Sequence, residues 1–242
     1  MTVALRGVKD AYHRMQVELL GAALICDPSG ALFLPDYATL VVSDLHLEKG
    51  SSFARRGQLL PPYDTAATLG MLARIIERYQ PKTVISLGDS FHDVRASERL
   101  PALYAIKLKS MMERRDWVWI TGNHDPERPA NLPGESVEEL ALGPLIFRHE
   151  PKRAGGRDGG RGEIAGHLHP AARIVKYGQS VRRPCFVSDG QRLIMPAFGA
   201  YTGALNILDR AFHGLFAEAT LRAYMLGAKR VYSIARGALR HG

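Results

Sequence analysis

Cysteine is scarce in this sequence. Only Cys26 and Cys185 occur among the 242 residues, and they lie far apart without a CxxC pattern. Two isolated cysteines exclude a disulfide framework and a zinc site built from paired thiolates. We therefore expect two buried thiols in a reducing compartment, with the cytoplasm as the default location.

Long hydrophobic runs are also missing. No segment approaches the ~20 apolar residues that a membrane-spanning helix needs. The short run "LLGAALIC" ends at Cys26, but Glu18 interrupts its approach and Ile25 is not the small residue that signal cleavage prefers. These features argue against a secretory signal and support the expectation of a cytoplasmic protein.

Acidic residues are fewer than basic ones, 24 against 32, which gives a formal net charge of +8. With 46% hydrophobic residues, a chain of this length predicts a globular protein with a substantial core, and we expect a single domain over residues 1–242. The positive charge is compatible with a polyanionic partner but does not identify one.

Short segments rich in Val, Ile, Phe and Trp recur along the chain and predict β-strands. They are residues 22–25, 39–43, 83–87, 117–121, 145–149, 163–167, 184–188 and 192–196. The alternation of strands and helical patterns between residues 39 and 121 predicts parallel strands with right-handed crossovers. The later half has strands with few helical patterns, so we expect two packed sheets flanked by helices.

Two helices are predicted between these strands. The first begins near Asp64, which can cap it, and Pro81 stops it; its apolar face holds Leu69, Leu72, Ile75, Ile76 and Tyr79. The second covers Glu98 to Arg115 and carries Leu100, Leu103, Leu108, Met111 and Met112. The Gly- and Arg-rich segment Glu150 to Glu163 lacks apolar anchors and predicts a mobile surface loop.

Side chains able to bind metal follow five of the predicted strands. In chain order they are Asp44 and His46; Asp89; Asn123, His124 and Asp125; His149; and His167 and His169. Six of the nine histidines lie in these motifs, the sixth being His92. Ligands of open α/β sheets bind beyond the carboxyl ends of the strands, so these groups can meet although they are distant in sequence.

The residue types favour a particular chemistry. Oxygen and imidazole ligands without thiolate suit Mn, Fe, Zn, Ni or Co, and a bridging carboxylate allows two ions ~3.5–4 Å apart. Such a pair of ions activates water and neutralises charge on a phosphoryl group. Gly88, Gly122 and Gly166 stand at strand ends, where a Cβ would crowd the turn or the ions. We interpret the set as a dinuclear hydrolytic centre.

The ordered motifs "DLH", "GD", "GNHD", a lone His and "GHLH" resemble the calcineurin-like metallophosphoesterases over about residues 40 to 170. The stretches "LEKGSSFARRGQLLPPYDT", "GDSFHD", "GHLHPAA", "RRPCFV" and "PAFGAYTG" are similar to ligase-associated DNA damage response endonucleases of the PdeM type, as far as about Gly203. The resemblance implies a four-layer αββα sandwich of two mixed sheets, a manganese-preferring dinuclear site, and nuclease or phosphodiesterase activity on DNA or RNA.

The resemblance also implies roles for individual residues. The first metal would be held by Asp44, His46, Asp89 and His169, and the second by Asp89, Asn123, His149 and His167. His124 would stabilise the phosphoryl oxygens or protonate the leaving oxygen. Many relatives have "GDxxD", whose second Asp orients this histidine, whereas this chain has His92 there with Asp93 next. Asp93, Asp125 and His92 are therefore alternative supports for His124.

Basic side chains near these motifs are candidates for substrate binding. They are Lys49, Arg55 and Arg56 after the first motif, and Arg182 and Arg183 before residues 184–188; a solvated charged surface is an equal alternative. Nucleic acid is the expected substrate. The resemblance adds a DNA ligase and a helicase of DNA repair as candidate partners. The oligomeric state stays open, with a homodimer as one alternative. An enzyme acting on cyclic nucleotides or phosphomonoesters is the main alternative. A binding module without catalysis would be expected to lack several ligands, and this chain has the full set.

Overall fold

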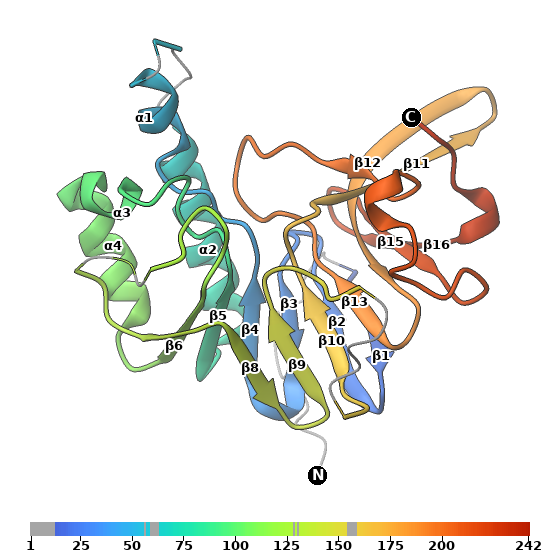
Figure 1. Cartoon of the computed structure of the whole chain (residues 1–242), viewed down its shortest axis with the longest axis horizontal. Helices are drawn as coiled ribbons and strands as arrows, with labels where there is room; N and C mark the ends of the chain where they lie inside the picture. The colour runs from blue at the N-terminus through green and yellow to red at the C-terminus, as the bar shows by residue number, and fades with distance from the viewer. Residues whose placement is uncertain (1–12, 56, 59–62, 128, 130, 154–158) are drawn as a thin grey trace.

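Two mixed β-sheets pack face to face in this protein, and α-helices cover the outer face of the first sheet (Figure 1). The computed structural model describes residues 13–55, 57–58, 63–127, 129, 131–153 and 159–242. The expectation of two mixed sheets with flanking helices is confirmed. None of the helices in these residues is long and apolar enough to cross a membrane.

The first sheet has seven strands in chain order. They are β1 (Met15–Leu19), β2 (Ala22–Cys26), β3 (Leu32–Leu34), β4 (Thr39–Val42), β5 (Thr83–Leu87), β6 (Asp116–Ile120) and β7 (Glu135–Val137). Strands β1 to β4 are antiparallel, whereas β4 to β7 are parallel. The parallel arrangement predicted for residues 39 to 121 is therefore confirmed, and the carboxyl ends of β4, β5 and β6 meet at one edge.

The second sheet contains the remaining strands. They are β8 (Glu139–Leu142), β9 (Leu145–Arg148), β10 (Gly162–Ala165), β11 (Pro170–Lys176), β12 (Gln179–Ser188), β13 (Arg192–Ile194), β14 (Leu205–Asn206), β15 (Arg222–Leu226) and β16 (Val231–Ala235). Strand β10 is parallel to both β9 and β13. Strand β12 is long enough to pair first with β11 and then with β13 and β15.

Four α-helices lie within the described residues, all between β4 and β6. They are α1 (Lys49–Ala54), α2 (Asp64–Tyr79), α3 (Ala96–Arg99) and α4 (Ala102–Met112); 3-10 turns lie at η1 (Pro35–Tyr37), η2 (Arg210–Phe212) and η3 (Arg236–Ala238). Helix α2 has the predicted bounds, but Asp64 is its first residue and does not cap it, because Asp64 Oδ2 accepts from the Gly50 N–H at 3.0 Å. Its chain leaves the helix at Gln80, which adopts a left-handed conformation before Pro81.

The second predicted helix, Glu98 to Arg115, is wrong as a single element. Leu100 and Pro101 are extended and separate α3 from α4, and the chain leaves α4 at Glu113. Proline has no N–H to donate and disfavours helical backbone in the residue before it. Of the apolar residues in the predicted helix, Leu103 is 71% exposed, whereas Leu108 is fully buried.

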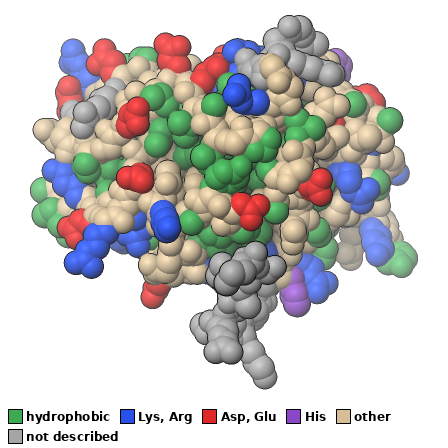
Figure 2. All heavy atoms as spheres, turned by 90° about the horizontal axis from the view of Figure 1, so that it is seen from below, with side chains coloured by type: hydrophobic (Ala, Val, Ile, Leu, Met, Phe, Trp, Pro, Cys, Tyr) green, Lys and Arg blue, Asp and Glu red, His purple; other side chains and the backbone are tan. Residues whose placement is uncertain are grey.

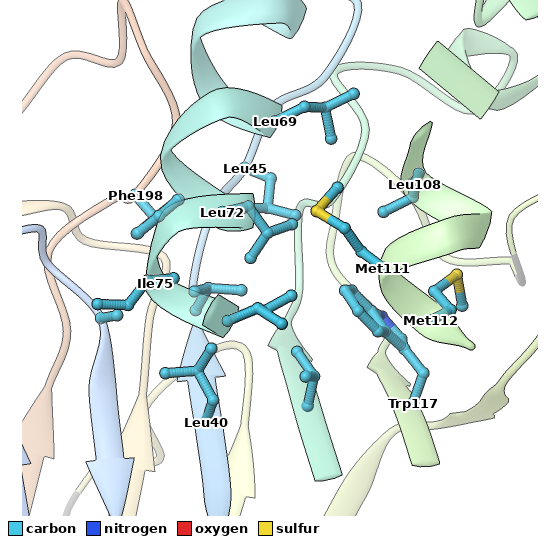
Figure 3. Packing of buried hydrophobic residues seen from close by; sticks show 14 of the residues in the cluster. Leu40, Leu45, Leu69, Leu72, Ile75, Leu108, Met111, Met112, Trp117 and Phe198 are labelled. Atoms are coloured by element: carbon cyan, nitrogen blue, oxygen red, sulfur yellow. The ribbon is translucent and has the colours of Figure 1, made fainter. Parts of the chain in front are cut away.

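Three hydrophobic clusters fill the layers. Figure 3 shows the first, where side chains of α2 and α4, such as Leu72 and Met111, pack on Leu40 and Trp117 of the first sheet. The second lies between the sheets and includes Cys26. The third covers the outer face of the second sheet with the C-terminal segment and includes Cys185. Both cysteines are free and buried, as predicted.

The loop predicted over Glu150 to Glu163 needs a correction at its end. Residues 154–158 lie outside the described part of the chain, but Glu163 belongs to β10 and is buried. Its carboxylate accepts a hydrogen bond of 2.7 Å from Arg148 Nη1 and another from Arg192 Nε. A buried carboxylate needs such partners, and the sequence did not reveal that two arginines of neighbouring strands supply them.

The two ends of the sheets differ in character. Figure 2 shows the end at which β5 and β6 begin, where hydrophobic side chains gather in the middle and acidic and basic side chains are scattered around them. At the opposite end, α1 and the β11–β12 hairpin rise on either side in Figure 1. The candidate site lies at this second end, because its residues follow the carboxyl ends of the strands.

Candidate metal centre

All seven predicted metal ligands are brought together by five strand ends. Asp44 and His46 follow β4, Asp89 follows β5, Asn123 follows β6, His149 follows β9, and His167 and His169 follow β10. Both sheets therefore contribute, with parallel strands delivering side chains to one edge.

The first group of ligands consists of Asp44, His46 and His169. His169 Nε2 lies 3.1 Å from Asp44 Oδ1 and 3.4 Å from His46 Nε2. Asp44 and His46 are buried, and His169 is partly exposed. The group matches three of the four ligands expected for the first metal.

The second group consists of Asp89, His149 and His167. His149 Nε2 lies 3.4 Å from Asp89 Oδ2, 3.2 Å from His167 Nδ1 and 3.0 Å from the side-chain oxygen of Asn123. Asp89 Oδ2 is also 3.9 Å from His46 Nε2 of the first group. One carboxylate oxygen thus faces both groups, and the other accepts the His124 N–H at 2.9 Å.

The ring tautomers test whether these residues fit a metal. His149 Nδ1 lies 3.2 Å from the Leu87 carbonyl and His169 Nδ1 lies 3.1 Å from the Gly203 carbonyl. A carbonyl only accepts, so both Nδ1 atoms carry hydrogen, and each ring in its neutral form turns the lone pair of Nε2 inward. Both Nε2 atoms face carboxylate oxygens, so a positive charge, either a ring proton or a bound metal ion, must lie between them. The donor set therefore fits divalent metal ions with oxygen and nitrogen ligands.

The shifted pKa values of the ligands also indicate that the site favours positive charge beside its carboxylates. Burial opposes ionisation of Asp89, but the hydrogen bond and charge of His149 outweigh it and lower the pKa to about 2. Burial likewise opposes protonation of His149, but the hydrogen bond to Asp89 and the charge of Asp44 raise its pKa to about 9. Burial lowers the pKa of His46 to about 4, which keeps this ring neutral and able to bind a cation.

Backbone strain is concentrated in the ligands. Asp44, His46, Asp89, His167 and His169 all have positive φ, between 44° and 68°. Each non-glycine residue in this region costs on the order of 1–3 kcal/mol, and such strain persists where the surrounding structure enforces a functional geometry. The fold therefore holds these side chains in place at a measurable cost.

The glycines at the strand ends are required by close packing, as predicted. A Cβ on Gly88 would lie 2.2 Å from the His149 ring, one on Gly122 would lie 2.2 Å from Asp89 Oδ1, and one on Gly166 would lie 2.7 Å from Asp44 Oδ2. The crowding is against the ligands themselves. Any larger residue would push a ligand out of position.

His124 stands beside the two groups with its Nε2 3.9 Å from Asp89 Oδ2. Its Nδ1 lies 2.9 Å from the His92 carbonyl, and the His92 ring stacks on its own ring with centroids 5.4 Å apart. Of the three alternative supports, His92 therefore contacts His124, through its backbone and its ring. The Nδ1 hydrogen bond leaves Nε2 directed at the site.

The two carboxylates proposed as catalytic candidates have other partners. Asp93 forms a bidentate ion pair with Arg99, with distances of 2.9 and 2.6 Å, and this guanidinium holds the pKa of Asp93 well below its usual range. Asp125 accepts backbone hydrogen bonds from Ser90 (2.8 Å) and Phe91 (3.1 Å). Asp125 thus braces the loop after Asp89, whereas Asp93 is tied to α3, and neither carboxylate forms a hydrogen bond with the His124 ring.

The predicted basic residues are divided between two places. Lys49 begins α1, and its Nζ donates to the Tyr201 carbonyl at 2.8 Å; Arg55 is exposed just after α1, and Arg56 lies outside the described residues. Arg182 and Arg183 are exposed on β12, where Arg182 donates to the Ala204 carbonyl. None of the four described side chains forms a hydrogen bond with a metal ligand.

Two aromatic residues at the site were not predicted. Tyr201 is 59% exposed in the loop that supplies the Gly203 carbonyl to His169. Phe53 of α1 lies against the His92 ring, with centroids 5.5 Å apart. The stretch "PAFGAYTG" could have pointed to Tyr201. The position of Tyr201 near the ligands, however, depends on residues 196–204 folding back over β4 and β10.

Two adjoining groups of metal ligands at one edge of a two-sheet α/β sandwich define a metal-dependent hydrolase. Residues 37–180 match the calcineurin-like phosphoesterase family. The chain belongs to this family, and it is a metal-dependent phosphoesterase.

One solved structure is similar over nearly the whole chain. The Pseudomonas putida nuclease MPE is 30% identical, with a TM-score of 0.71, over 92% of this chain and 100% of that chain. The E. coli phosphoesterase Yfce is 14% identical, with a TM-score of 0.43, over 81% of this chain and 98% of that chain, which is too distant to support an argument. No curated protein matches the sequence significantly.

Proposed function

We propose that this protein is a dinuclear, manganese-preferring phosphodiesterase that cleaves phosphodiester bonds of DNA or RNA, in end-processing during DNA repair. The observation that carries the proposal is the place of Asp89, whose Oδ2 faces His46 of one ligand group and His149 of the other. Similarity to the P. putida nuclease MPE supports nucleic acid as the substrate.

The residues have distinct roles in this proposal. Asp44, His46, Asp89 and His169 would hold one ion, and Asp89, Asn123, His149 and His167 would hold the other. When bound, two such ions supply a hydroxide at neutral pH and neutralise charge on the phosphoryl group. His124 presents Nε2 to the substrate because its Nδ1 is held by the His92 carbonyl, so it is placed to stabilise a phosphoryl oxygen or protonate the leaving oxygen.

The cellular location and the partners are proposed from other features. Two buried, unpaired thiols support a cytoplasmic location. The resemblance to ligase-associated endonucleases of the PdeM type supports a DNA ligase and a helicase as partners. Each is testable by affinity capture of the tagged protein from its native host.

The function is tested by stripping the protein with chelator and restoring single metals. We expect manganese to restore cleavage of single-stranded DNA or RNA at low salt, and the stripped protein to be inactive. Cyclic nucleotides, a phosphomonoester and a chromogenic diester are assayed in parallel. Efficient turnover of a cyclic nucleotide or monoester, with no detectable cleavage of DNA or RNA, would instead establish the small-substrate alternative.

A further inference from the structure

The hairpin of β11 and β12 carries an unbalanced positive charge. Residues 170–184, here called the basic arm, contain Arg173, Lys176, Arg182 and Arg183 and no Asp or Glu. The inner ends of both strands are buried, but the chain is exposed from Val175 through Pro184. In Figure 1 the arm projects beyond the rest of the second sheet. Its outer part therefore contributes little to the core.

The cations of the basic arm have no acidic partner in the part of the chain that the structure describes. Arg173 and Arg182 are opposite each other in the β11–β12 register, where like charges destabilise a sheet. Arg173 donates to Ser180 Oγ and the His241 carbonyl, both at 2.7 Å, and Arg182 donates to the Ala204 carbonyl. None of the four cations forms an ion pair with a carboxylate of the described residues. An anionic ligand would relieve this repulsion.

The basic arm is continuous with the metal centre. It begins directly after His169, and the Ala204 carbonyl bound by Arg182 follows Gly203, whose carbonyl orients that histidine. From Pro170 the seven residues of β11 lead away from the site. At a rise of ~3.3 Å per residue the arm reaches roughly 20 Å beyond the metal ligands, a distance that only an extended substrate can use.

From these observations we propose that the basic arm binds the phosphate backbone of a nucleic-acid strand leading away from the cleaved bond. The proposal rests on the proposed function, because it concerns the same substrate. It adds that the enzyme gains affinity from nucleotides several positions away from the metals. Tyr177 at the turn, 92% exposed, offers a ring on which an unpaired base can stack.

A second copy of this chain is a less suitable occupant. Val175, Tyr177 and Val181 are exposed on the basic arm, which gives it some apolar surface. However, two identical arms placed together would oppose four cations with four more, without a carboxylate on either arm. Repulsion of this kind disfavours self-association through the arm.

The test compares two variants with the same change in net charge. The arm variant replaces Lys176, Arg182 and Arg183 by Gln. The control variant replaces Lys107 and Lys109 of α4 and the nearby Arg114 by Gln, all exposed and on the helical side of the first sheet. Binding of a fluorescent 20-nucleotide strand is measured by anisotropy in chelator across a salt series. Cleavage of this strand and of a dinucleotide is measured with manganese, and thermal melting confirms folding.

We expect the arm variant to bind the strand roughly tenfold more weakly and to flatten the slope of log K against log salt by about 2, since each lost phosphate contact contributes about 0.7. Cleavage of the long strand should fall more than cleavage of the dinucleotide, and the control variant should resemble wild type. Equal losses in both variants would reject the arm and indicate a general charge effect.

Two further outcomes separate the arm from the proposed function. If the wild type cleaves nucleic acid and the arm variant binds and cleaves it equally well, only the arm proposal fails. If the wild type hydrolyses small diesters but neither binds nor cleaves any strand, the proposed function fails and the arm proposal with it. Sedimentation of both variants provides the last check, because a wild-type dimer that the arm variant converts to monomer would make the arm an interface between copies.

Discussion

Backbone carbonyl groups orient three histidines of the metal centre. Leu87 accepts from His149, Gly203 from His169 and His92 from His124. A carbonyl cannot become a donor, so each ring keeps one tautomer whatever the protonation state of the carboxylates nearby. Because every residue type has this carbonyl, the hydrogen bond to His124 Nδ1 does not depend on the side chain at position 92, whereas the ring stacking does.

The first prediction concerns His124. Replacing it by Ala removes Nε2 but keeps the backbone N–H that binds Asp89 at 2.9 Å. We therefore expect turnover to fall by a factor of order 10²–10⁴ while metal content stays near wild type. His149→Ala is the matched comparison and should lose metal and activity together. Loss of metal from His124→Ala, measured by elemental analysis, would make His124 a ligand.

The second prediction concerns Asp93, which pairs with Arg99 and not with His124. The pair lowers the pKa of Asp93, so its stabilising contribution is present above the unfolded-state pKa of about 3.9 and is lost as pH falls through the lower folded-state value. Asp93→Asn should lower the melting temperature at pH 7, and the difference from wild type should shrink as pH falls below 4. A loss of turnover as large as that of His124→Ala would return Asp93 to a catalytic role.

At the scale of elements, α3 and α4 show how one proline divides an apolar pattern between two helices. Leu100 precedes Pro101 and is only partly buried. Helix α4 begins after the proline, so its side chains do not continue the helical periodicity of α3. As a result Leu103 faces solvent while Leu108, Met111 and Met112 face the sheet (Figure 3). The segment packs on the sheet through Leu108, Met111 and Met112, although it forms two helices and not the single predicted one.

The third prediction uses two leucines of α4. Leu108→Ala removes a fully buried side chain and should lower the free energy of unfolding by about 2–5 kcal/mol. Leu103→Ala, 71% exposed in the same helix, should change it by no more than about 0.5 kcal/mol. Denaturant unfolding of both variants measures the difference. Similar losses would mean that the face of α4 has been assigned wrongly.

At the scale of the whole molecule, the metal centre joins the two sheets. Its ligands come from β4, β5 and β6 of the first sheet and β9 and β10 of the second. Five of them occupy strained left-handed backbone, and their acceptor atoms face one another. Cations bound there would hold the sheets together at the edge where the cores end, so metal binding and folding are coupled.

The fourth prediction follows from this coupling. Manganese at 100 times its dissociation constant should stabilise the stripped protein by about 2.7 kcal/mol, because it binds only the folded chain. For this chain length the melting temperature should rise by roughly 5–10 °C. Asp89→Asn should abolish both the shift and the activity, whereas Asp116→Asn, at the far end of β6, should keep them. An unchanged shift in Asp89→Asn would remove Asp89 from the metal centre.

The sequence by itself determined the chemistry and the general fold. Strand patterns predicted the parallel core of residues 39 to 121, and ligand types at five strand ends predicted the metal centre, because local periodicity and side-chain chemistry are properties of short segments. The close contacts of Gly88, Gly122 and Gly166 were also foreseeable, since glycine at a strand end indicates tight packing.

Only the tertiary structure decided how these parts meet. The support of His124 by a carbonyl, the pairing of Asp93 with Arg99 and the burial of Glu163 each depend on segments brought together by the fold. Strand β11 was not predicted, so the alignment of Arg173 opposite Arg182 was not foreseen. Every residue has the same backbone N–H and C=O groups, so a sequence does not show which of them will bond to a side chain. Strand register is set by pairing across the sheet. For these physical reasons, contacts of this kind can be seen only in the folded chain.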